Sequence, residues 1–156
     1  ILSKILGIPK GVEACDSLAK RNIESMDAGS INNHRFFTGV SFPSARAVVR
    51  CGSKYDMKTE RRGEIEVRNL SVAEPKDATN ISNPTDGKLD VVITTHVPRR
   101  FRKISVVSRI PLKSFKLLFD EPVKVQADGL TLEGEEFTLR TEASALNVIV
   151  GKERMF

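Results

Sequence analysis

The sequence predicts a mainly β fold, a two-layer antiparallel β-sandwich with a short N-terminal helix. Apolar, β-branched runs recur about every 8–12 residues, a spacing typical of sandwiches and barrels. Two Asp-Gly pairs, Asp86-Gly87 and Asp128-Gly129, adjoin such runs. Asp-Gly favours hairpin turns, because glycine tolerates positive φ and aspartate bonds its own backbone. Residues 88–95 are nearly all apolar, which indicates a strand buried on both faces.

The first elements follow from local periodicity. Residues 9–21 are expected to form the helix, because apolar side chains recur there at helical spacing and Pro9 suits the entry turn. Strand signals begin near Met26. Residues 35–40 and 45–51 are rich in β-formers, with residues 41–44 between them. In residues 63–71 apolar and charged side chains alternate, the pattern of a half-buried strand.

The remaining segments complete the sandwich. Residues 71–85 contain prolines and asparagines and are expected to form a loop. The remaining predicted strands are residues 88–95, 104–110, 114–119, 123–127, 136–142 and 146–150. No second domain or internal repeat is evident, so residues 1–156 are interpreted as a single domain.

Composition supports a soluble globular chain. Of 156 residues, 40% are hydrophobic and 29% charged, which is ordinary for a domain with a buried core. No apolar run is long enough for a transmembrane helix, and Gly7 and Pro9 interrupt any leader-like start. Cys15 and Cys51 lack histidine partners at metal spacing, which favours two free thiols in a reducing cytoplasm over a zinc site. The first residue is not Met, which suggests a piece of a longer protein.

The net charge of +5 is unevenly distributed. Between Val97 and Leu118 there are seven cations and no acid, and between Phe119 and Glu142 there are seven acids against two cations. Such a division predicts one positive face, suited to phosphates or to an anionic membrane. The basic residues that flank Phe101 either grip phosphate or form a solvated loop.

Several short motifs, taken together, carry a family resemblance. They are Leu6-Gly7-Ile8-Pro9, the stretch from Met26 to Asn32 followed by Arg35-Phe36-Phe37, Ile65 to Leu70, Asp86 to Val91, and Val123 to Gly129. In order and spacing the chain resembles the second half of the bacterial diacylglycerol kinases, relatives of the sphingosine kinases. The resemblance implies a lipid kinase that uses ATP and magnesium, whose nucleotide-binding domain would precede Ile1. The chain itself has no Gly-rich phosphate loop.

The resemblance also assigns site residues. It implies a magnesium ion in the first Asp-Gly loop, at positions Asn83, Asp86 and Lys88, where a hard cation takes carboxylate and carbonyl oxygens. It assigns the catalytic base to Asp128, which would take a proton from a lipid hydroxyl. The sequence departs from the family at Leu130, where a glutamate is usual.

Two other functions stay open. A non-catalytic lipid- or partner-binding homologue agrees with Leu130, and a nucleic-acid-binding β module agrees with the basic segment. One tyrosine and no tryptophan argue against nucleic acid, whose bases stack on aromatic side chains. The resemblance implies a lipid substrate and ATP as partners. An anionic membrane, at which the cytoplasmic protein would be peripheral, and a second copy of the chain are further expected partners.

Overall fold

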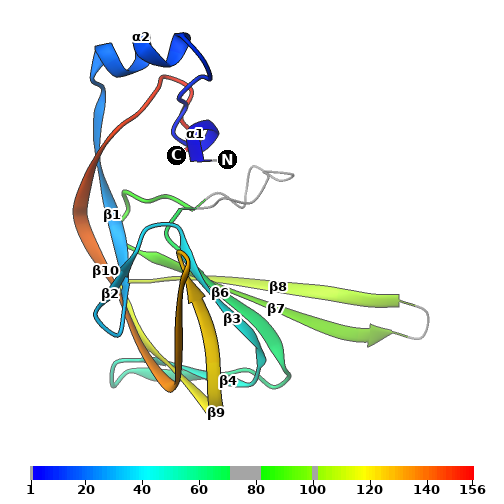
Figure 1. Ribbon diagram of the computed structural model, residues 1–156. Coiled ribbons are helices and arrows are strands. Elements are labelled where there is room, and N and C mark those ends of the chain that lie inside the picture. The colour runs from blue at the N-terminus through cyan, green and yellow to red at the C-terminus, as the bar shows by residue number, and fades with distance from the viewer. Residues whose placement is uncertain (1, 71–81, 100–101) are drawn as a thin grey trace.

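The computed structural model describes residues 2–70, 82–99 and 102–156. Its two helices are α1 (Leu2–Ile5) and α2 (Glu13–Lys20). The strands are β1 (Ile23–Ile31), β2 (His34–Phe36), β3 (Gly39–Ala45), β4 (Ala47–Cys51), β5 (Tyr55–Lys58), β6 (Gly63–Arg68), β7 (Leu89–Arg99), β8 (Arg102–Leu112), β9 (Ser114–Ala127) and β10 (Leu130–Ile149). The predicted mainly antiparallel β fold with a short N-terminal helix is confirmed (Figure 1).

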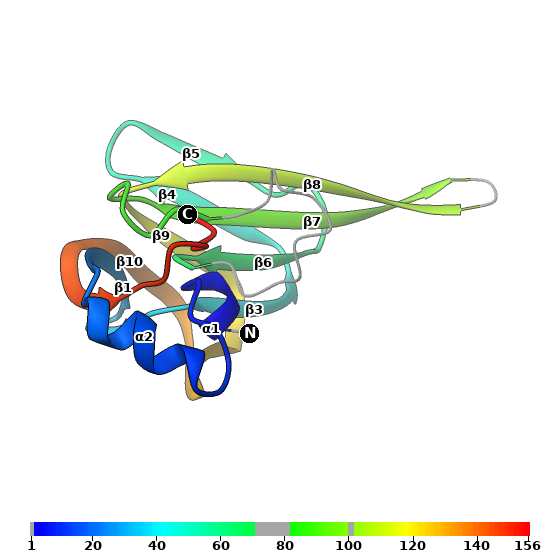
Figure 2. The same ribbon diagram turned by 90° about the horizontal axis from the view of Figure 1, so that it is seen from above.

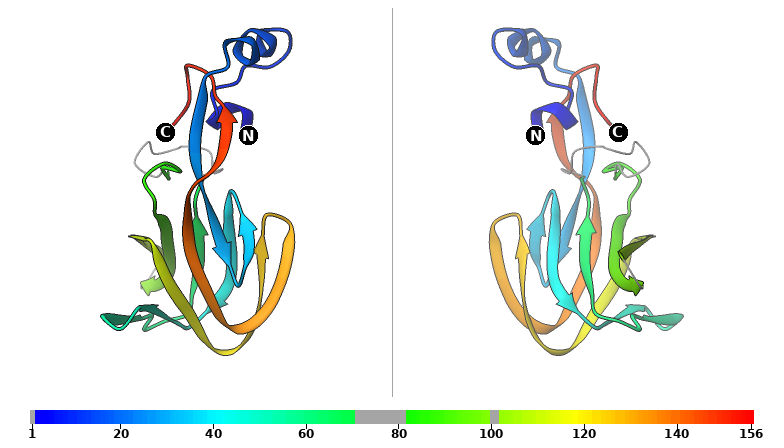
Figure 3. Two further views of the ribbon diagram at one scale, coloured as in Figure 1. Left: turned by 90° about the vertical axis from the view of Figure 1, so that its left-hand side faces the viewer. Right: turned by 90° about the vertical axis from the view of Figure 1, so that its right-hand side faces the viewer.

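The strands form one continuous sheet, in the order β2-β1-β10-β9-β3-β6-β7-β8, with β4 attached to β9 and β5 to β4. Two layers arise because β9 and β10 change partners along their length. Residues 116–119 of β9 pair with β4, and residues 114–118 pair with residues 136–140 of β10. Farther along β9, residues 126–127 pair with β3, and residues 123–127 pair with residues 130–134 of β10. The two strands bend together from one layer into the other (Figure 3).

The main core lies between these layers. Phe42 of β3 packs against Phe119 of β9 and Phe137 of β10, with ring centroids 5.5–6.0 Å apart in the trio. Phe42 belongs to one layer, and Phe119 and Phe137 come from the parts of β9 and β10 in the other. All three rings are buried, and each aromatic pair adds about 0.5–1.5 kcal/mol beyond the burial of its area. The trio therefore joins the layers.

A smaller apolar cluster lies beside α1, where the two chain ends meet (Figure 1). Its buried members are Ile5, Leu6, Met26, Leu70 and Val150. The helix α2 differs, because it buries none of its residues. Only α1 is therefore anchored to the β fold by a hydrophobic core.

Several predicted elements match closely. Strands predicted at residues 45–51, 63–71 and 104–110 correspond to β4, β6 and β8, and the predicted helix corresponds to the shorter α2. The alternation predicted for residues 63–71 is confirmed, because Ile65 and Val67 are fully buried between exposed or half-buried charged residues. The helix α1 and the strand β5 were not predicted.

Other predicted boundaries are wrong. Residues 114–119 and 123–127 belong to the single strand β9, because Pro122 stands at its bend and does not end it. The strands predicted at residues 136–142 and 146–150 likewise belong to β10, which ends at Ile149. The predicted strand at residues 35–40 is interrupted at Phe37 and Thr38, and the predicted gap at residues 41–44 lies inside β3.

The two Asp-Gly pairs differ in their structural role. Asp128-Gly129 is the two-residue turn between β9 and β10, with φ of 43° and 90°, so this predicted hairpin is confirmed. Asp86-Gly87 instead turns a loop into β7, because the described residues before it, 82–85, are not in a strand. Asp86-Gly87 is therefore a turn between a loop and a strand, not a hairpin turn.

Part of the predicted loop at residues 71–85 lies outside the described residues, as do residues 100–101 of the basic segment. In the described part of the chain, no helix has the length and apolarity needed to cross a membrane. The β7–β8 hairpin is longer than predicted and projects well beyond the rest of the sheet (Figures 1 and 2).

Candidate functional site

The carboxylate of Asp128 lies against the break between β2 and β3. It accepts hydrogen bonds from the backbone N–H of Phe37, from the N–H of Thr38 at 3.0 Å, from the N–H of Gly39 at 3.3 Å, and from the Thr38 hydroxyl. An interrupted strand leaves N–H groups that its neighbours in the sheet do not pair. Asp128 supplies the acceptor for these groups and thereby fixes the turn to the break.

These hydrogen bonds determine the acidity of Asp128. Burial raises the pKa of its carboxyl, but the Thr38 hydroxyl and the amides of Phe37, Thr38 and Gly39 outweigh burial and bring the pKa below its usual value. The group is therefore charged at neutral pH and held in one orientation. The carboxylate is unprotonated at neutral pH and can accept a proton, but its low pKa makes it a weak base.

A cavity of about 320 Å³ begins beside this carboxylate. Thr38 and Gly39, which donate to Asp128, form part of its wall. The cavity lies on the outer side of β3 and β9, because its polar residues Ser41 and Gln126 alternate with core residues. The lining residues are Thr38, Gly39, Val40, Ser41, Glu66, Val67, Arg68, Leu70 and Gln126.

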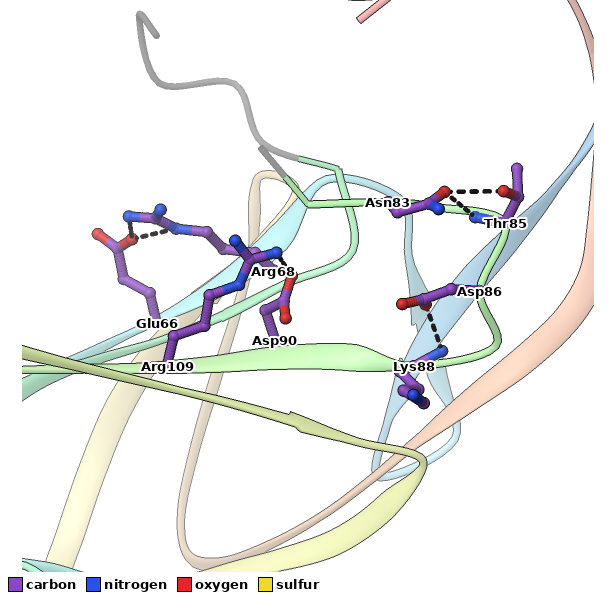
Figure 4. Close-up of polar contacts among 8 residues, drawn as sticks. All are labelled: Glu66, Arg68, Asn83, Thr85, Asp86, Lys88, Asp90 and Arg109. Carbon is purple, nitrogen blue, oxygen red and sulfur yellow. Dashed lines mark hydrogen bonds and ion pairs between the residues drawn. The ribbon is translucent and has the colours of Figure 1, made fainter. Parts of the chain in front are cut away.

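Two ion pairs continue across this outer side of the sheet (Figure 4). The guanidinium of Arg68 donates to Glu66 from Nε at 2.7 Å, and both residues line the cavity. Arg109 of β8 donates to Asp90 of β7 at 2.6 Å. The hydrogen bond to Asp90 raises the pKa of Arg109, and the charge of Asp86 adds to this effect. These two ion pairs therefore lie on the outer side of the sheet, between the cavity and the Asp86 loop.

The three residues expected to hold magnesium share one loop (Figure 4). The side-chain oxygen of Asn83 accepts two hydrogen bonds from Thr85, at 3.0 Å from the amide and 2.7 Å from the hydroxyl. One oxygen of Asp86 accepts from the amide of Lys88 at 2.9 Å. The Asn83 side chain is therefore already used in a turn, whereas Asp86 offers a second oxygen.

The donor set around Asp86 is small. Among the described residues, no group of three or more His, Cys, Asp or Glu side chains is placed to hold a metal ion. Asp86 therefore fits a hard cation only as a single carboxylate assisted by backbone carbonyls. The Asn83 side chain does not fit this role in its present hydrogen bonds, and the metal assignment stays a prediction.

A buried acid, Asp27 of β1, connects this loop to the β-sandwich. Its side chain is 3% exposed and accepts hydrogen bonds from the amides of Gly87 at 2.7 Å and Ser144 at 2.9 Å. Its own N–H donates to the carbonyl of Pro84 at 2.6 Å. Asp27 thus fixes the Asp86 loop to both β1 and β10.

The network reaches Asp128 through Asn69, which is fully buried. The amide nitrogen of Asn69 donates to the carbonyls of Asp27 at 2.8 Å and Phe37 at 2.9 Å. Phe37 in turn donates its N–H to Asp128. The structure therefore joins the two predicted sites indirectly: within the described residues, no hydrogen bond or ion pair connects Asp86 to Asp128.

Leu130 occupies the first position of β10 and is 42% exposed. Thr131 points to the cavity side, where its hydroxyl accepts from Gln126 at 2.9 Å. By strand alternation Leu130 lies on the opposite side, the side of Leu132, which packs on the core. A glutamate at position 130 would therefore stand at the rim of the core and not in the 320 Å³ cavity.

The fold has close counterparts among solved structures. A diacylglycerol kinase from Bacillus anthracis strain Sterne matches 96% of this chain with a TM-score of 0.74 at 14% identity. Two further diacylglycerol kinase-like structures from that organism match the same share, with TM-scores of 0.72 and 0.77 at 13% identity. The chain shares its fold with these structures. It spans 62–65% of the length of these relatives, so it corresponds to part of them.

The sequence comparisons add nothing to this result. No protein-family model matches the chain, and no curated protein matches it. The resemblance inferred from the sequence motifs is confirmed at the level of the fold. Whether the chain also has the activity of these relatives is a separate proposal.

Sequence reasoning found Asp128 and the Asp86 loop but missed Asp27 and Asn69. Both residues lie inside motifs that carried the family resemblance, from Met26 to Asn32 and from Ile65 to Leu70. The available signal was a polar residue among buried positions: Asn69 continues the spacing of Ile65 and Val67, and Asp27 lies between Met26 and Ala28. Because buried polar groups require partners, such a residue predicts a hydrogen-bond network.

Proposed function

We propose that this chain is the lipid-binding and proton-accepting part of a lipid kinase, which uses ATP and magnesium to phosphorylate the hydroxyl of diacylglycerol or a related lipid. The observation that carries the proposal is the diacylglycerol kinase fold, which extends over nearly the whole chain. A fold alone does not assign a reaction, so the site must supply the chemistry.

Asp128 would accept the proton of the lipid hydroxyl. Its carboxylate is charged and oriented before substrate arrives, because the residues of the strand break hold it. Such positioning lowers the entropic cost of reaching the reactive geometry. A magnesium ion at Asp86 would supply a fixed positive charge that orders the loop. Asp27 would hold that loop against the sandwich, so the hydrogen-bond network would fix the position of Asp86 relative to Asp128.

The nucleotide-binding part of the enzyme would cover α2. Leu18 of this helix is 48% exposed, Val12 immediately before the helix is 85% exposed, and the helix buries no residue. Uncovered apolar side chains on one helix favour a further packing partner. A domain that binds ATP beside α2 would bury these side chains and bring the nucleotide toward the β fold.

A second candidate is a homologue that binds a lipid or a partner without catalysis. Two observations favour it: Leu130 stands where the family has glutamate, and the hydrogen bonds of Asp128 lower its pKa and thus its strength as a base. In that case Asp128 would be a structural residue that closes the strand break.

An assay of the longer protein that contains this chain distinguishes the two candidates. Purified protein would receive radiolabelled ATP, magnesium and diacylglycerol in detergent micelles, and labelled phosphatidic acid would be separated by thin-layer chromatography. We expect labelled product, which the kinase proposal requires. Lipid binding by equilibrium sedimentation with no labelled product would favour the non-catalytic homologue.

A further inference from the structure

The side chains that face the cavity beside Asp128 are polar. Three apolar residues also line this cavity, but Val40, Val67 and Leu70 bury their side chains in the two apolar clusters of the fold. On β3, β6 and β9, strand alternation turns the intervening residues to the cavity side. These residues, which we call the polar wall, are Ser41, Glu66, Arg68 and Gln126.

The polar wall runs across three neighbouring strands. Ser41 of β3 stands opposite Glu66 of β6 on one side and Gln126 of β9 on the other. Since neighbouring strands lie about 4.8 Å apart, these three side chains form a row. Arg68 follows on the same side of β6, and its partner in the register is Gly39, which has no side chain. Space therefore remains over β3 in which one ligand can contact both Arg68 and the row.

Part of the polar wall already has hydrogen-bond partners. Arg68 donates from Nε and Nη2 to the same carboxylate oxygen of Glu66, Oε2 (Figure 4). Gln126 donates its side-chain amide to Thr131 at 2.9 Å. Within the described residues, Oε1 of Glu66, the side-chain oxygen of Gln126 and the Ser41 hydroxyl make no hydrogen bond. The polar wall therefore offers a ligand both acceptors and a hydroxyl.

These groups suit a ligand that carries several hydroxyls. A hydroxyl donates to one group and accepts from another, which matches acceptors such as Glu66 beside donors such as Ser41 and Arg68. An ammonium only donates, so it would leave these donors unpaired. A phosphate only accepts, and it would approach the negative charges of Glu66 and Asp128. An acyl chain would remove water from the polar groups without bonding to them, which costs free energy.

We propose that the cavity binds a polyol head group, the glycerol or sugar part of a lipid, and so favours acceptors with such a head group over diacylglycerol. Placing the acceptor lipid in this cavity rests on the proposed function, and the class of head group is the new element. Diacylglycerol has a single free hydroxyl and would use fewer groups of the polar wall. A volume of about 320 Å³ is at the lower end of the range for ligand pockets, which suits a head group and leaves the acyl chains outside.

Binding of short-chain lipids to this chain, without ATP or magnesium, tests the proposed head-group site. The probes are a glucosyl diacylglycerol, the same diacylglycerol without the sugar, and the same lipid with an aminoethyl group in place of the sugar, each kept below its micelle concentration. In amide NMR spectra we expect the glucosyl lipid to shift the signals of Thr38, Gly39 and Ser41. It should bind about tenfold more tightly than the other two lipids, because it makes several hydrogen bonds that they lack.

Three results would overturn the assignment of a polyol. They are equal affinity for the glucosyl lipid and diacylglycerol, tighter binding of the aminoethyl lipid, and no binding of the glucosyl lipid.

Matched substitutions locate the bound head group. Glu66→Gln removes the carboxylate and weakens its ion pair with Arg68, so it should weaken binding of the glucosyl lipid about tenfold. Glu64→Gln lies two residues earlier on the same side of β6, outside the cavity lining, and should change the affinity less than about twofold. Ser41→Val removes the hydroxyl but leaves the Glu66–Arg68 pair intact, and it should also weaken binding. If the variants keep the native amide spectrum and the two glutamate substitutions have equal effects, the lipid binds elsewhere.

The head-group site and the phosphotransfer can fail separately. A protein in which this chain follows the proposed nucleotide-binding domain would be assayed with the same lipids. If it phosphorylates diacylglycerol while the chain shows no preference for the glucosyl lipid, the kinase proposal holds and the polyol site is wrong. If the chain binds the glucosyl lipid at the polar wall but no phosphate is transferred, the head-group site holds and the phosphotransfer is wrong.

Discussion

Replacing Asp128 by asparagine should destabilise the fold by a measurable amount. The carboxylate accepts hydrogen bonds from three consecutive amides and from one hydroxyl at the β2–β3 break. Asparagine keeps one acceptor oxygen, but its amide nitrogen would oppose an N–H donor. A hydrogen bond to a charged group contributes about 1.5–3 kcal/mol, and solvent screening at this exposed turn reduces that amount. We expect a loss of about 1–2 kcal/mol in the free energy of unfolding.

The effect should depend on pH in a defined direction. Because folding lowers the pKa of Asp128, the unfolded chain binds more protons than the folded chain between the two pKa values. The stabilisation is therefore complete above the unfolded pKa of about 3.9 and is lost as the pH falls through the lower folded pKa. The difference between wild type and Asp128→Asn should be constant near neutral pH and should shrink below about pH 4.

Urea unfolding followed by circular dichroism measures this difference. The matched control is Asp120→Asn, an exposed aspartate on the same strand β9, which should change stability by less than about 0.5 kcal/mol. Thermal melts should agree, because 1–2 kcal/mol corresponds to about 3–6 °C in a chain of this size. If Asp128→Asn unfolds at the same urea concentration as wild type at neutral pH, the proposed anchoring of the strand break is wrong.

Four further predictions follow from other parts of the structure. Asp27→Asn should lower the free energy of unfolding by about 2–3 kcal/mol in urea titrations, because asparagine keeps only one of the two buried oxygens that accept from amides. An unchanged urea midpoint would contradict the hydrogen-bond network around Asp27. Gly29→Ala should lower the free energy of unfolding by about 1–3 kcal/mol in the same titrations, because a Cβ there would lie 2.1 Å from the Phe36 ring. Adding Phe36→Leu to this variant should recover part of the lost stability. Magnesium at ten times its Kd should stabilise the chain by about 1.4 kcal/mol in thermal melts, and Asp86→Asn should abolish that gain; a gain that survives the substitution would place the ion elsewhere. Calorimetry of this chain alone should detect no binding at millimolar ATP, because no phosphate-binding loop is present, and micromolar affinity would refute a separate nucleotide domain.

The sequence predicted features that depend on neighbouring residues. The turn at Asp128-Gly129 follows from the conformational freedom of glycine, and the strand β6 follows from strict alternation. Features that depend on distant residues were missed. Pro122 signals the end of a strand in isolation, but β9 continues through it because β10 bends alongside. The connection from Asp27 to Phe37 through Asn69 joins separate motifs, and no local pattern predicts which partner a buried amide will find.

The same distinction applies to the candidate site. The resemblance predicted that Asp128 is a base, and its position opposite the β2–β3 break gives it a structural function. Stability must therefore be measured beside activity. A domain typically has about 5–15 kcal/mol of stability, so a loss of 1–2 kcal/mol leaves Asp128→Asn folded. A large fall in the turnover of Asp128→Asn would then reflect the loss of the carboxylate and not unfolding.

The most direct test of the proposed function is the rate of phosphate transfer to diacylglycerol by a protein in which this chain follows the proposed nucleotide-binding domain. Wild type, Asp128→Asn and Asp120→Asn would be compared at matched folded concentration. The account predicts measurable turnover in wild type and Asp120→Asn and a fall of about 10²–10⁴-fold in Asp128→Asn, the usual cost of losing a general base. An active wild type whose turnover is unchanged by Asp128→Asn would contradict the assignment of the proton acceptor.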